Sequence, residues 1–74
     1  MDEITRQLID MTGGTIPADD MITLRKHSKL VEVDGRLEVV VNPHGCLILA
    51  KHAPDPVTRA LMTTHFESII KEMS

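Results

Sequence analysis

The chain has 74 residues, a formal net charge of −3 with neutral histidines, one aromatic side chain and one cysteine. This length predicts one domain over 1–74 with a small aliphatic core, and it leaves little room for an enclosed substrate pocket. One cysteine excludes an intramolecular disulfide, the acidic balance argues against non-specific nucleic-acid binding, and the absence of any apolar run of roughly 18 residues argues against a membrane span. We therefore expect a cytoplasmic protein that makes no membrane contact.

Two N-terminal segments have helical features. Residues 2–12 place Ile4, Leu8 and Met11 at helical spacing, and a pair of glycines follows the segment. Residues 17–28 begin with acids and end with bases, as the helix dipole favours, but part of the segment alternates as a strand does. The sequence therefore predicts a helix over 2–12 and leaves 17–28 open between a short helix and a strand.

A β-hairpin is the strongest structural signal in the chain. Asp34-Gly35 lies between two apolar runs, which is typical of a hairpin turn. A three-residue loop that includes Val33 pairs Val31 with Leu37 and places the apolar side chains of both strands on one face. Because burial normally selects such a register, we expect this loop rather than a two-residue one.

The residues after the hairpin suggest a third strand. The sequence Asn42-Pro43-His44-Gly45 fits a type I turn, with Asn, Pro and Gly at their preferred positions. The apolar run 46–50 does not alternate, which indicates a strand covered on both faces. The sequence thus predicts a three-stranded antiparallel meander.

The last segment predicts a long helix from about residue 56 to residue 73, with Asp55 as its N-cap. Its apolar residues change sides midway along the helix. We expect the first group, with Val57 and Leu61, to pack inside the chain, and the second, larger group to contact another chain or the far side of the fold. The predicted partner interface comprises Met62, Phe66, Ile69, Ile70 and Met73, together with Val40 from the sheet.

Few residues suggest catalytic or metal chemistry. His44, Cys46 and His52 could be read as metal ligands or as a thiol with its base, but they lack the spacing of a known site. Cys46 begins an apolar run, where a buried and unreactive thiol is the usual state. We therefore predict no enzyme activity, no metal and no cofactor.

One basic cluster suggests an alternative function. It consists of Arg25, Lys26, Lys29 and Arg36. If 17–28 is a helix, then helix and hairpin together resemble a winged-helix layout in outline, in which a helix enters the major groove and the hairpin contacts phosphate.

These features together predict an α+β fold. An N-terminal helix and a second short helix or strand precede the three-stranded meander, and the long C-terminal helix packs on the sheet. The predicted function is that of a small non-catalytic interaction or regulatory protein, a homodimer or the binder of a protein partner. Uncovered apolar area on two elements supports this prediction, and nucleic-acid binding through the basic cluster is the alternative.

Overall fold

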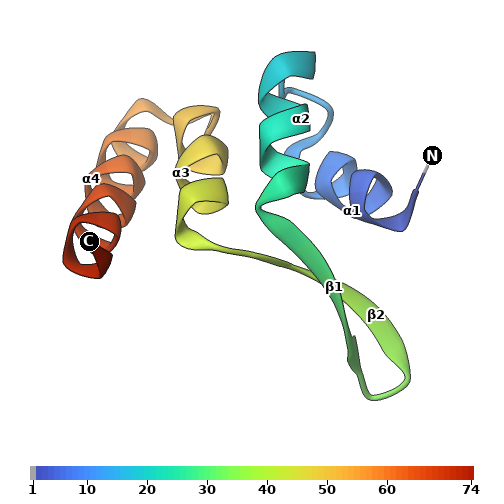
Figure 1. Ribbon diagram of the computed structural model, residues 1–74. Helices are drawn as coiled ribbons and strands as arrows, with labels where there is room; N and C mark the ends of the chain where they lie inside the picture. Colours follow the sequence, from blue (N-terminus) through green and yellow to red (C-terminus); the bar gives the residue numbers. More distant parts are fainter. Residues whose placement is uncertain (1) are drawn as a thin grey trace.

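Figure 1 shows the computed structural model, which describes residues 2–74. The elements in chain order are α1 (Glu3–Thr12), α2 (Ala18–Lys26), β1 (Ser28–Val33), β2 (Arg36–Val41), α3 (Pro43–Lys51) and α4 (Pro56–Met73). The fold is α+β, but the described residues form only one two-stranded antiparallel sheet. The prediction of a three-stranded meander is therefore wrong.

Both N-terminal segments are helical. Asp2 caps α1 by accepting a hydrogen bond from the backbone N–H of Thr5 at 2.7 Å, and Gly13 ends the helix in the left-handed conformation with φ of 67°. The segment that the sequence left open forms α2, with Asp19 and Asp20 in its first turn and bases in its last. The charge order, which suits the helix dipole, was the informative signal here.

The hairpin has a two-residue loop and not the expected three-residue loop. Asp34 and Gly35 both have positive φ, 51° and 79°, as a type I′ turn requires. The pairing sets Val31 opposite Glu38 and Glu32 opposite Leu37. Burial did not select the register, because the tip of the hairpin projects beyond the helices and leaves Leu37 exposed (Figure 1).

The predicted third strand is a helix, α3. Asn42 is its N-cap, accepting a hydrogen bond from the backbone N–H of Gly45 at 3.0 Å, and Pro43 is its first residue. The Asn-Pro pair that fits a turn therefore starts a helix instead. A short apolar run such as 46–50 is compatible with either structure, because it has no periodicity to distinguish them.

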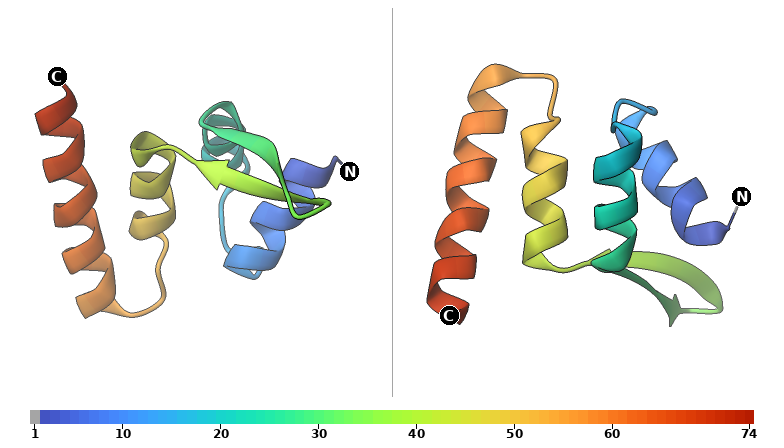
Figure 2. Two further views of the ribbon diagram at one scale, coloured as in Figure 1. Left: turned by 90° about the horizontal axis from the view of Figure 1, so that it is seen from below. Right: turned by 45° about the horizontal axis from the view of Figure 1, so that its top comes forward.

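The C-terminal helix α4 has the predicted bounds but a different neighbour. Asp55 caps it through the backbone N–H of Thr58 at 2.8 Å. The main contacts of α4 are with α3 and not with the sheet, so the prediction that this helix packs on the sheet is wrong. Figure 2 shows the helices in the order α4, α3, α2, α1 across the molecule, with the hairpin on the side away from α4.

The core is small and takes one fully buried apolar side chain from each of α1, α2 and α3. Its fully buried apolar residues are Leu8, Leu24 and Ala50, whereas nine large apolar side chains of residues 2–74 are exposed. The radius of gyration is 12.7 Å, compared with roughly 11 Å for a compact domain of this length. The chain therefore forms an open arrangement that covers little of its own apolar surface.

Candidate interaction surfaces

Helix α3 is mostly apolar but only partly covered. Cys46, Leu47, Ile48 and Leu49 follow one another, and at about 100° per residue they point in four directions around the helix axis. All four are half-buried, whereas Gly45 and Ala50 of the same helix are buried and His44 and Lys51 are exposed. Helices α2 and α4 flank α3, so its remaining two sides are where additional cover is missing.

Helix α4 has no fully buried residue. Val57 and Leu61, which we expected to pack inside the chain, are 66% and 68% exposed. Phe66, Ile69 and Ile70 are instead half-buried, on a helix whose main contacts are with α3. The structure thus reverses the division that the sequence suggested between the two halves of this helix.

One flank of α4 is apolar and the other is polar. At about 100° per residue, Leu61, Met62, Ile69 and Met73 lie within an arc of about 120°. The opposite flank has the polar residues Thr63, Glu67 and Lys71. We call the apolar flank of α4 and the half-buried leucine and isoleucine residues of α3 the α3–α4 surface. Its members are Leu47, Ile48, Leu49, Leu61, Met62, Ile69 and Met73.

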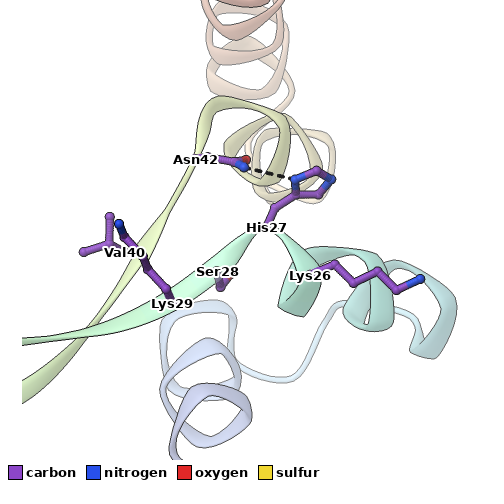
Figure 3. Close-up of a pocket in the computed structure, with 6 residues that line it drawn as sticks. All are labelled: Lys26, His27, Ser28, Lys29, Val40 and Asn42. Carbon is purple, nitrogen blue, oxygen red and sulfur yellow. Dashed lines mark hydrogen bonds between the residues drawn. The ribbon is translucent and has the colours of Figure 1, made fainter.

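Val40, the remaining residue of the predicted partner interface, lies apart from this surface. It is on β2, is 43% exposed and lines a hollow of about 400 Å³ with Lys29 and Asn42. Figure 3 shows it beside Lys29, whereas α4 lies beyond α3. The structure therefore groups five of the six predicted interface residues on one helix and separates the sixth.

The basic cluster is divided in the structure. Arg25 forms an ion pair with Asp2, and Arg36 forms one with Glu38 at 3.6 Å. Lys26 and Lys29 both line the hollow described above, but their side chains extend in different directions (Figure 3). The four side chains do not converge on one ligand.

The histidines and the cysteine have structural contacts. His27 at the end of α2 stacks on His44 of α3, with ring centroids 5.4 Å apart, and the side-chain amide of Asn42 lies 3.0 Å from His27 Nδ1. His52 Nε2 lies 2.7 Å from a carboxylate oxygen of Asp20 and so connects the C-terminus of α3 to α2. Burial raises the pKa of the Cys46 thiol, which disfavours the reactive thiolate.

A contact that the sequence did not reveal involves Gln7 of α1. Its amide nitrogen donates to the carbonyl of Leu37 at 2.8 Å, and its amide oxygen accepts from the N–H of Val39 at 2.9 Å. A side-chain amide thus pairs with the outer edge of β2 as a neighbouring strand would. No sequence signal points to this contact, because a glutamine on a helix is an ordinary surface residue.

Comparisons with models of protein families, with curated proteins and with solved structures find no significant match to this chain. Among residues 2–74, no three His, Cys, Asp or Glu side chains are grouped so that they could hold a metal ion. None of the described helices is both long enough and apolar enough to cross a membrane. The surfaces described above are therefore the basis for assigning a function.

Proposed function

We propose that this chain is a small non-catalytic interaction protein that self-associates, with a second copy covering the α3–α4 surface. The observation that carries the proposal is the apolar surface left on two neighbouring helices: Leu47, Ile48 and Leu49 of α3 are only half-buried, and Leu61, Met62 and Met73 of α4 are exposed. Monomeric proteins rarely leave contiguous apolar patches of this kind uncovered. The single half-buried cysteine suits the reducing cytoplasm, where we place the protein.

The accessible surface is larger than that of a compact monomer of this mass. The surface measures 5102 Å², whereas a compact monomer of 8.2 kDa exposes about 4,500 Å². The excess is similar in size to the roughly 800 Å² that each partner buries in a stable interface. A twofold pair is the commonest way for identical chains to cover one patch each, because the patch then pairs with itself.

Sedimentation of the wild type beside Leu61→Asp tests this proposal. Leu61 is 68% exposed, so a charge there leaves the interior of the monomer intact while it opposes burial in an interface. Losing one buried leucine costs about 1.5–3 kcal/mol, so we expect the dissociation constant to rise at least about 10-fold. Ile22→Asp is the matched control, because Ile22 is 55% exposed on α2 and lies outside the α3–α4 surface.

The expected result is a wild-type dimer, a monomeric Leu61→Asp variant with unchanged helix content, and a dimeric Ile22→Asp variant. A wild type that stays monomeric at high concentration would refute the proposal. Equal loss of association in both variants would also contradict it, because the effect would not be specific to the α3–α4 surface.

Nucleic-acid binding is the alternative function and has weaker support. In a helix and hairpin of winged-helix outline, the N-terminal residues of the recognition helix contact the base edges. The first turn of α2 instead has Asp19 and Asp20, whose charges repel phosphate. Two arginines of the basic cluster are also paired with carboxylates. A salt-sensitive shift of duplex DNA at low ionic strength, lost in Lys26→Ala with Lys29→Ala, would favour this alternative.

A further inference from the structure

The two edges of the hairpin differ. Backbone groups in an antiparallel strand point alternately toward the paired strand and away from it. Because Gln7 contacts Leu37 O and Val39 N, the backbone groups of those residues point away from β1, and their partners Glu32 and Leu30 likewise point away from β2. The Gln7 amide covers the outer edge of β2 at Leu37 and Val39. The outer edge of β1 lies on the opposite side of the hairpin.

The outer edge of β1 has open backbone groups. Within residues 2–74, no hydrogen bond outside the ladder reaches the backbone N–H or C=O of Leu30 or Glu32. Proline residues and β-bulges are two of the features that normally block strand addition. The strand Ser28–Val33 has neither of them. An unpaired edge of this kind accepts a further strand through main-chain hydrogen bonds.

We propose that this edge pairs with β1 of a second copy, antiparallel and about a twofold axis at Val31, so that two hairpins form one four-stranded sheet. The inference rests on the proposed self-association, because its occupant is also a second copy of this chain. In this register Leu30 of each copy exchanges hydrogen bonds with Glu32 of the other, because the backbone groups of both residues point outward.

The side chains favour this occupant and this register. Val31 then lies opposite Val31 of the second copy in a pair without hydrogen bonds, where side chains come closest and β-branched residues pack well. Val33, which is 38% exposed on the same face, gains the aliphatic stem of Lys29 of the second copy as a neighbour. Because β1 pairs with itself in this register, a second copy of the chain supplies the whole partner strand.

Disulfide cross-linking tests the register directly. The parent chain has Cys46→Ala, which removes the only native thiol. In this background Val31→Cys places two thiols across the twofold axis, at the close Cα separation that a disulfide accepts. Val33→Cys is the matched control on the same face of the same strand, because its two copies lie about 13 Å apart along the strands.

We expect mild oxidation to convert Val31→Cys to a covalent dimer at least 10-fold faster than Val33→Cys. Adding Glu32→Pro removes an outward N–H and no ladder bond, so it should slow the Val31→Cys reaction by a similar factor. Circular dichroism of each variant confirms that the hairpin persists. Equal cross-linking at positions 31 and 33, or none at 31, overturns the inference.

The outcome is separable from that of the proposed function. If the Cys46→Ala parent chain sediments as a monomer, both proposals are refuted. The parent chain could instead associate, dissociate with Leu61→Asp and yet not cross-link through position 31. That result refutes only the strand pairing.

Discussion

The side-chain oxygen of Gln7 accepts a hydrogen bond from the backbone N–H of Val39 at 2.9 Å, across 32 positions of sequence. With the companion bond to Leu37 O, one glutamine joins α1 to the hairpin. We expect Gln7→Ala to lower the free energy of unfolding by about 1–2 kcal/mol, since each hydrogen bond contributes about 0.5–1.5 kcal/mol. Urea denaturation measures this change.

Gln7→Glu is the matched control for that prediction. The carboxylate keeps an acceptor for the Val39 N–H but has no proton to donate to Leu37 O at neutral pH. Its stability should fall below that of the wild type, because the new oxygen faces Leu37 O and also the Glu3 carboxylate, to which Gln7 Nε2 donates at 2.8 Å. Equal stability of all three proteins would mean that the two hydrogen bonds contribute nothing.

Gly45 allows α3 to approach α2 closely. A Cβ atom at this position would lie 2.4 Å from Cγ1 of Val41 and 3.3 Å from Cδ1 of Leu24. We expect Gly45→Ala to destabilise the fold by about 1–3 kcal/mol through overpacking, measured by thermal unfolding. Adding Val41→Ala removes the nearest atom, so the double variant should regain part of the loss. If instead the two losses add, steric conflict is not the cause.

The contact between His52 and Asp20 should contribute to the packing of α3 on α2. The atoms Nε2 and Oδ2 are 2.7 Å apart, and the side chains are partly exposed. A double-mutant cycle with His52→Ala and Asp20→Ala should give a coupling free energy of about 0.2–1 kcal/mol. A cycle with no coupling would show that the two residues do not stabilise the junction.

The helix caps predict a loss of stability in acid. The backbone N–H of Thr58 lowers the pKa of Asp55 below its ordinary value of 3.8, and the N–H of Thr5 lowers that of Asp2 in the same way. A lowered pKa in the folded state gives stability that is present above the unfolded value and lost as pH falls through the folded value. We therefore expect stability to decline below about pH 3.8.

Asp55→Asn separates this effect from general acid unfolding. The amide oxygen can still cap α4, but it does not titrate. Stability of the variant, followed by circular dichroism from pH 6 to about pH 2, should depend less steeply on pH than that of the wild type. An identical pH dependence would assign the acid sensitivity to other carboxylates.

The helix ends were predictable because their signals are local. Asp55-Pro56 gives the start of α4, and the left-handed Gly13 follows α1, as the sequence suggested. Asn42-Pro43 has the same N-cap and first-residue chemistry, but the short apolar run after it also fits a strand. The prediction of a third strand was wrong because the short apolar run has no clear helical or strand period, although the N-cap signal of a helix was present.

The register and the interaction surfaces depend on tertiary contacts that the sequence does not show. The expected three-residue hairpin loop depends on a sheet that is buried on one face, but Leu37 lies near an exposed tip. The grouping of Met62, Ile69 and Met73 on one flank followed from helical spacing alone. Which flank of α4 packs on α3 did not follow, because that required the position of α3.

Gln7 also limits what the hairpin can become. Chains with exposed β-structure and much uncovered apolar surface are prone to unlimited strand stacking, in which every added ribbon offers a fresh site for the next. The side-chain amide of Gln7 occupies the outer edge of β2 at Leu37 and Val39. In the proposed pairing, which uses the edge of β1, we therefore expect strand addition to stop at two copies.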